Sequence, residues 1–183
     1  MVARMIFSML SLFFLSCFPT ERLPGGSKVP KRGYVFKNTK KIDKSVYEVV
    51  DTLHFYKLTG TFFSDKSFNK TRNDEFSGST QRLQFYQNGR IRMFSEKYKN
   101  ANPNIIGRRG IIYADKKVIK IDITVADQNG SISIDTYTIK VVGDKLYLLE
   151  NNAFFLNNNE TMCFVYEKSE KIPEDWNQYK ADW

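Results

Sequence analysis

Few side chains in this sequence are of the types that perform catalysis or bind metals. It contains one histidine, His54, and two cysteines, Cys17 and Cys163. One imidazole and one thiol do not supply a His-rich or Cys-rich metal site. A nucleophilic pair of Cys163 and His54 would require the fold to bring them together, and nothing in their sequence contexts indicates this. These residues alone therefore indicate no active site.

Other short motifs are equally uninformative about catalysis. The sequence has no nucleophile elbow, phosphate-binding loop or dinucleotide fingerprint. Asp74 and Glu75 lack a third acidic partner for calcium. The run Gly107-Arg108-Arg109-Gly110 has the chemistry to hold an anion, although paired arginines on a turn are usually solvated. We expect neither an enzyme nor a cofactor, and catalysis by carboxylates alone is the enzymatic alternative left open.

Cys17 ends a segment that is typical of exported proteins. Arg4 precedes Met5–Leu15, an apolar run long enough for the core of a signal peptide but too short to cross a bilayer. The following Phe14-Leu15-Ser16-Cys17 resembles a bacterial lipobox, although most lipoboxes have Leu where Phe14 stands. The resemblance implies cleavage after residue 16 and a lipid thioether on Cys17. We therefore predict a lipoprotein held in the bacterial cell envelope, at the outer membrane; the alternative is an ordinary secretory signal.

The basic charge of the chain is concentrated after Cys17. The whole chain has a net charge of +8, and residues 17–44 alone hold eight Lys or Arg against Glu21 and Asp43. This segment is rich in Pro and Gly and lacks apolar periodicity, so we predict a disordered basic tether over residues 17–44. It would either attract anionic lipids or serve as a solvated linker. Since the remaining chain is nearly neutral, we expect no nucleic-acid partner.

Residues 45–183 show short runs of alternating apolar residues separated by turn sequences, which is typical of antiparallel β-structure. A type I′ hairpin turn is predicted at Asn88-Gly89, and a bulge or a bend near Asp135, where the apolar phase of 131–142 shifts by one residue. A run at 46–50 fits either a strand or a helical turn. The expected strands are 53–63, 80–86, 90–94, 105–114, 118–126, 131–142, 145–149, 153–156 and 161–168.

The alternation also predicts which side chains face the core. In the hairpin and the next strands we expect Leu83, Phe85, Ile91, Met93, Ile119, Ile121, Ile123 and Val125 inside, and Gln84, Arg90, Arg92, Lys120, Asp122 and Thr124 in solvent. The segment 171–183 contains both tryptophans and fits neither strand nor long helix. It either packs its aromatic residues on the domain or acts as a lid or docking peptide.

Eight or nine strands with short connections predict an all-β, up-and-down antiparallel meander that closes into a barrel of about eight strands over residues 45–170. The pattern resembles the lipocalin-like domains of bacterial lipoproteins, through Leu58-Thr59-Gly60-Thr61-Phe62 and the closing Cys163–Lys168. Lipocalins usually have Gly-x-Trp at the first strand, where the Trp plugs the barrel; Phe62 stands there in this chain. The resemblance implies a cavity for a small hydrophobic ligand.

Two functions follow from this interpretation. In the first, the barrel binds a small apolar ligand, lined by Phe85, Met93, Ile121, Ile123, Tyr137 and Ile139. In the second, the same residues fill a dry core, and the protein acts as a structural or protein-interaction lipoprotein whose partner the sequence does not identify.

Overall fold

The structure is a computed structural model that describes residues 19–126, 131–151 and 160–183. Cys17, the predicted signal peptide and the strand predicted at 153–156 lie outside the described residues. Among the described residues the elements are β-strands and short 3-10 helices, and no helix is long and apolar enough to cross a membrane. The prediction of an all-β fold is confirmed.

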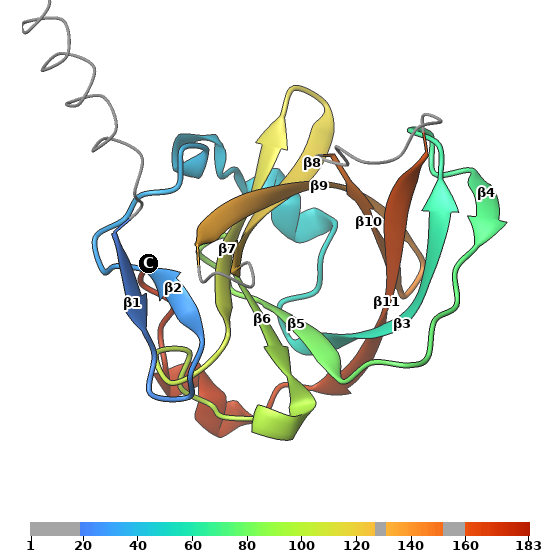
Figure 1. Cartoon of the computed structure of the whole chain (residues 1–183). Helices are drawn as coiled ribbons and strands as arrows, with labels where there is room; N and C mark the ends of the chain where they lie inside the picture. The colour runs from blue at the N-terminus through green and yellow to red at the C-terminus, as the bar shows by residue number, and fades with distance from the viewer. Residues whose placement is uncertain (1–18, 127–130, 152–159) are drawn as a thin grey trace, which may run out of the picture.

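Eight strands form a closed antiparallel barrel (Figure 1). Consecutive strands pair with one another, and the last pairs with the first along most of its length, which leaves neither with an open edge. The predicted up-and-down barrel is therefore confirmed. The barrel strands are β3 (His54–Ser64), β5 (Gln81–Phe85), β6 (Arg90–Ser95), β7 (Arg108–Asp115), β8 (Val118–Ala126), β9 (Ile132–Val142), β10 (Lys145–Glu150) and β11 (Thr161–Lys171).

The remaining elements surround this barrel. A two-stranded hairpin, β1 (Thr20–Arg22) and β2 (Lys28–Pro30), lies on one side, and β4 (Lys70–Asn73) extends β3 on the other (Figure 1). The 3-10 helices are η2 (Thr39–Lys41), η3 (Lys44–Glu48), η4 (Glu96–Tyr98) and η5 (Glu174–Gln178).

One end of the barrel is closed by η3. Val46 and Val50 are buried in the same core cluster as the inward residues of the strands, and Tyr47 packs against it. Figure 1 shows η3 within the ring of strands. Phe62, the aromatic residue implied as a plug by the resemblance, instead pairs opposite Cys163 and packs against Tyr147, on the outside of the barrel. Phe62 lies outside because a register shift around Thr59 reverses the facing of the residues after it. The barrel is plugged instead by the segment before β3.

The predicted hairpin is present as β5 and β6, with a different turn. Tyr86 and Arg90 are joined by a backbone hydrogen bond, and the Gly89 amide donates to the Tyr86 carbonyl. Gly89 has a φ of 75°, and Asn88 is not among the residues of positive φ. This is a three-residue loop with a glycine bulge rather than the type I′ turn we predicted.

Of the bulge or bend predicted near Asp135, the bulge is absent. β9 pairs with β8 without a register shift from Lys120↔Thr138 to Ala126↔Ile132. The apolar phase changes because Ile134 packs on the outside of the barrel, against the cluster that contains Trp183. The register shifts of the described barrel lie between β3 and β11, beside Gly60 and near Lys171.

Several side chains predicted in solvent are buried on the outer face. Arg92, Gln84, Asp122 and Thr124 are all less than 5% exposed. The Arg92 guanidinium donates to the carbonyls of Ile106 and Asn100. These side chains point outward as the alternation predicts, but the outer face is itself covered by other parts of the chain.

Residues 19–44, predicted as a disordered tether, form one of these covers. Val29 and Phe36 are 0% and 2% exposed. Their burial stabilises the segment as apolar surface removed from water. Basic residues of this segment are tied to the barrel and the tail: Lys41 pairs with Asp115 at 3.0 Å and Arg32 with Asp182 at 3.1 Å. The absence of apolar periodicity indicated an irregular segment, but not a disordered one.

The C-terminal segment forms the second cover, in agreement with the packing alternative. η5 begins after Pro173, and Trp176 meets Phe55 edge to face at 5.2 Å between ring centroids. The indole of Trp183 donates to the Gly110 carbonyl at 3.0 Å. Both tryptophans are therefore structural parts of the outer face.

Candidate functional site

The barrel interior is the first part of the candidate site. The six residues predicted to line a cavity all belong to one buried cluster inside the barrel, each 8% exposed or less: Phe85, Met93, Ile121, Ile123, Tyr137 and Ile139. The half nearer η3 is filled, since Ile112, Ile121 and Leu146 are 0% exposed. Whether the interior holds a ligand stays a prediction.

Polar side chains collect toward the end of the barrel opposite η3. Alternation from Tyr137 and Leu148 places Asp135 and Glu150 on the inward face, and both are half-buried. Arg108, at the start of β7, acts electrostatically on Asp135 and Tyr137. The buried hydroxyl of Tyr166 donates to Gln81 at 2.6 Å. An apolar space with a few convergent polar groups at one end is the usual form of a small-molecule site.

Burial shifts the pKa values of the ionisable side chains at this end of the barrel. Desolvation raises the pKa of Glu150, and the nearby Asp135 raises it further. Desolvation likewise raises the pKa of Asp135, although Arg108 and a hydrogen bond from Tyr137 oppose the shift. Burial also raises the pKa of the Tyr137 hydroxyl, which stays a hydrogen-bond donor. Perturbed acids at one end of a buried apolar cluster mark a candidate site.

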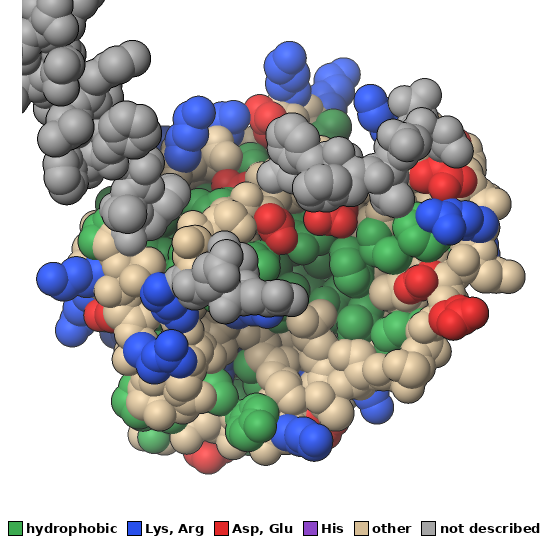
Figure 2. Space-filling model, viewed as in Figure 1, with side chains coloured by type: hydrophobic (Ala, Val, Ile, Leu, Met, Phe, Trp, Pro, Cys, Tyr) green, Lys and Arg blue, Asp and Glu red, His purple; other side chains and the backbone are tan. Residues whose placement is uncertain are grey.

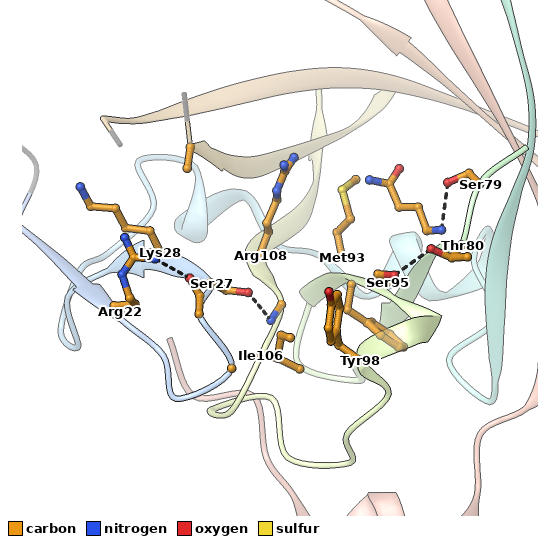
Figure 3. A pocket seen from close by; sticks show the side chains of 16 residues that line it. Arg22, Ser27, Lys28, Ser79, Thr80, Met93, Ser95, Tyr98, Ile106 and Arg108 are labelled. Atoms are coloured by element: carbon orange, nitrogen blue, oxygen red, sulfur yellow. Dashed lines mark hydrogen bonds between the residues drawn. The ribbon is translucent and has the colours of Figure 1, made fainter. Parts of the chain in front are cut away.

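A groove beside this end of the barrel is the second part of the site. It has a volume of about 640 Å³ and lies between the β1–β2 hairpin, η4 and the adjoining ends of β5, β6 and β7. In Figure 3, Arg22 and Lys28 lie on one side, Ser79 and Thr80 on the other, and Arg108 and Met93 between them. Figure 2 shows apolar side chains in the hollow at the mouth of the barrel, on the same face of the molecule.

Arg108 and Arg109 have different environments, although both were expected on a solvated turn. They begin β7, so alternation sends Arg108 inward and Arg109 outward. Arg109 is 5% exposed and donates to Glu21 at 3.1 Å and to the Pro30 carbonyl. Extending the alternation of Ile112 and Ala114 back along the strand would have separated the two. Lys28 and Arg22 were missed because they were assigned to a tether.

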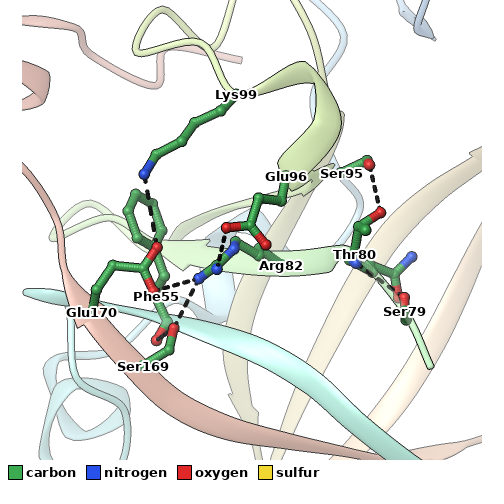
Figure 4. Close-up of polar contacts among 10 residues, drawn as sticks. Phe55, Ser79, Thr80, Arg82, Ser95, Glu96, Lys99, Ser169 and Glu170 are labelled. Carbon is green, nitrogen blue, oxygen red and sulfur yellow. Dashed lines mark hydrogen bonds and ion pairs between the residues drawn. The ribbon is translucent and has the colours of Figure 1, made fainter.

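The wall formed by η4 is held by an ion-pair network on the outer face. Arg82 is 4% exposed and donates to Glu96 at 2.7 Å, to Glu170 at 2.6 Å and to Ser169 at 3.0 Å (Figure 4). This network connects β5, η4 and β11. Its chemistry is that of a structural cross-link, because both terminal nitrogens of the Arg82 guanidinium donate to acceptors within the protein.

The remaining chemically reactive side chains lie apart. His54 starts β3 and contacts Asp51 at 2.8 Å, whereas Cys163 pairs opposite Phe62. Eight positions along a strand span roughly 26 Å, so these two residues form no pair. Burial raises the pKa of the Cys163 thiol to about 12, which disfavours the nucleophilic thiolate. Among the described residues, no three His, Cys, Asp or Glu are grouped as metal ligands.

Comparison with known proteins adds no family assignment. No protein-family model, curated protein or solved structure matches this chain. The functional argument therefore depends on the barrel and the groove beside it.

Proposed function

We propose that this protein is a membrane-anchored lipoprotein whose lipocalin-like barrel binds a small hydrophobic ligand. The observation that carries the proposal is the asymmetry of the barrel interior. Val46 and Val50 close one end, apolar side chains line the middle, and Arg108, Asp135 and Glu150 converge at the other. Such a space offers an apolar ligand a place out of water, and a few polar groups to orient it.

Native mass spectrometry of the full chain, purified from a cell envelope and then extracted with solvent, tests this function. A stoichiometric small molecule in the extract is the expected result. A bare protein that also fails to bind fatty acids and apolar dyes would contradict the proposal.

A bulky side chain on the inward face should block such a ligand. Val125 shares the inward face of β8 with Ile123 and is half-buried. We expect Val125→Trp to weaken dye binding about tenfold or more, because the ring would occupy the space needed by the ligand. Val142→Trp is the control, since Val142 is 54% exposed. Equal dye affinities for the two variants would contradict a ligand in the interior.

The alternative is a structural or protein-interaction lipoprotein with a filled core. The complete burial of Ile112, Ile121 and Leu146 favours it, because that half of the barrel is already packed. Removing residues 172–183 does not separate the two functions, since the tail packs on the barrel through Trp176 and Trp183. The dye measurement with Val125→Trp separates them instead.

The membrane anchor has its own test. Lipidation of Cys17 would hold the protein at the cell envelope, since two or more acyl chains anchor stably where one does not. We expect radiolabelled palmitate to be incorporated into the wild-type chain and Cys17→Ser to enter the aqueous phase of a detergent partition. A Cys17→Ser protein that stays with the detergent would show that the anchor lies elsewhere.

A further inference from the structure

A second cavity lies on the outer face of the barrel, beside the C-terminal segment 172–183. It has a volume of about 540 Å³, which is in the range of small-molecule sites. Its lining comes from the end of β5 and the turn after it, from Thr52 and Leu53, and from the C-terminal segment. All of these segments lie within the described residues 19–126 and 160–183. The cavity shares no lining residue with the groove at the barrel mouth.

The C-terminal segment leaves this space because it is anchored at two points. Trp176 packs edge to face on Phe55, and the Asn88 side chain donates to the Ala181 carbonyl at 2.6 Å. Between these contacts, residues 177–180 are exposed or half-buried, so their side chains do not pack tightly onto the strands. The cavity is therefore a result of how the segment crosses the outer face.

Gln84 brings a hydrogen-bond donor to this cavity. It is 4% exposed and belongs to the lining. Its Oε1 accepts from the Tyr86 hydroxyl at 3.1 Å, whereas its amide nitrogen makes no hydrogen bond within the described part of the chain. The fully enclosed, unpartnered side-chain nitrogens of the described residues all belong to arginines, so the Gln84 nitrogen keeps access to the cavity. A nearly buried donor of this kind is costly unless a ligand or solvent supplies an acceptor.

Tyr86 determines which end of the Gln84 amide is left for a ligand. Burial raises the pKa of the Tyr86 hydroxyl to about 12, against the opposing effect of Arg92. The hydroxyl therefore keeps its proton at neutral pH and donates it to the Gln84 oxygen, which leaves the amide NH₂ for another acceptor. Arg92 is not part of the lining and donates to the carbonyls of Ile106 and Asn100.

The rest of the lining favours a neutral, ring-shaped ligand. Tyr86, Trp176 and Tyr179 contribute aromatic side chains, against which flat rings pack well. Leu53 adds an apolar side chain that is 56% exposed. The charged residues of the lining are Lys180 and Asp182, which are both exposed and have opposite signs, so the lining has no net charge.

We propose that this cavity binds a small neutral molecule with a flat, ring-shaped apolar body and a carbonyl oxygen that accepts from Gln84. The aromatic side chains of the lining would pack on the ring. The carbonyl would supply the acceptor that the Gln84 nitrogen lacks. This site goes beyond the ligand proposed for the barrel interior and does not depend on it.

Two probes that differ by one carbonyl group, 1-indanone and indane, test the inference on the full chain. NMR detects binding at the indole N–H signals, because the chain has two tryptophans, Trp176 and Trp183, and Trp176 lines the cavity. We expect 1-indanone to shift the Trp176 signal and to bind about threefold or more tightly than indane, which is the contribution of one hydrogen bond. Indane-5-carboxylate, an anionic probe, should bind no more tightly than 1-indanone.

Substitutions of Gln84 test the donor itself. Gln84→Glu replaces the amide nitrogen by an oxygen and keeps an acceptor for Tyr86, so it should abolish the preference for 1-indanone while indane still shifts the Trp176 signal. Gln84→Met removes the donor without adding charge and should have the same effect if Gln84→Glu fails to fold. Gln178→Glu is the matched control, since Gln178 is exposed on η5 and does not line the cavity; it should keep the full preference.

Each contrary outcome overturns a defined part of the inference. If neither neutral probe shifts the Trp176 signal, the cavity is not a ligand site. Equal affinities for 1-indanone and indane would overturn recognition of the carbonyl, and a preference that survives in both Gln84 variants would overturn Gln84 as the donor. Tighter binding of the carboxylate than of 1-indanone would show an anion site instead. None of these results depends on the barrel interior, which the Val125→Trp measurement tests separately.

Discussion

At the scale of single residues, Glu150 and Asp135 connect the barrel interior to pH. Burial raises the pKa of both carboxyls, so each holds its proton in the folded protein at pH values where the unfolded chain has released it. Folding stability then decreases as the pH rises from the ordinary value of 4.5 for a glutamate through the raised pKa of the folded state. Above that pH the cost of the buried charge is fully present.

Glu150→Gln should remove this cost, because the amide does not ionise. We expect the stability of the variant relative to wild type to increase as the pH rises above 4.5, with a flatter Tm profile through the raised pKa of Glu150. Thermal melts at each pH measure the effect. Glu75→Gln, on an exposed loop, should follow the wild-type profile. Parallel profiles for Glu150→Gln and wild type would show that Glu150 is not desolvated.

Gly110 and Gly60 provide a matched pair for testing close packing around the barrel wall. A Cβ on Gly110 would lie 2.5 Å from the Asp122 carbonyl and 3.0 Å from Ile123, whereas a Cβ on Gly60 would meet no atom within 4 Å. We expect Gly110→Ala to lower the free energy of unfolding by about 1–3 kcal/mol. Gly60→Ala should change it by less than about 0.5 kcal/mol. Denaturant melts with similar midpoints for both variants would contradict this packing.

At the scale of elements, the segment before the barrel is the main departure from the sequence prediction. Phe36 is 2% exposed and packs with Ile111, Tyr113 and Trp183, whereas its neighbour Val35 is 70% exposed. We expect Phe36→Ala to destabilise the whole domain by about 3–5 kcal/mol, measured by chemical denaturation. Val35→Ala should stay within about 0.5 kcal/mol of wild type. A Phe36→Ala protein as stable as wild type would support the predicted disordered tether instead.

The same segment shows what local patterns can and cannot predict. Strands were predictable because alternation is a property of neighbouring residues, and Ile119, Ile121 and Ile123 face inward as expected. The burial of Asp122 could not be predicted in this way, because it depends on Asn38, which is 84 positions away in sequence and donates to Asp122 at 2.9 Å. The inward-facing candidate residues of the site were predictable because they follow the alternation of their strands. The groove was not predictable, because it forms between segments that are distant in sequence.

At the scale of the whole molecule, the folded unit begins close to its predicted anchor. Thr20 opens β1 only three residues after Cys17, and three residues span at most about 11 Å. The amide of Lys31 donates to the Pro19 carbonyl at 2.8 Å, so Lys31 lies beside the start of the described chain. The hairpin and β4 lie on opposite sides of the barrel (Figure 1). A lipid on Cys17 would therefore hold one side of the barrel near the bilayer.

Fluorescence quenching by nitroxide-labelled lipids tests this orientation in the lipidated protein. A fluorophore on Lys31→Cys should be quenched strongly, and one on Lys66→Cys, beside β4, should be quenched weakly, because nitroxide quenching requires close approach. Both sites are exposed, and the native Cys163 is 0% exposed, so labelling is directed to the introduced thiol. Equal, weak quenching at both positions would indicate a long flexible connection between lipid and barrel. Since the Lys31 amide is hydrogen-bonded to the Pro19 carbonyl, strong quenching at position 31 would place the hairpin itself at the membrane surface, on the side of the groove.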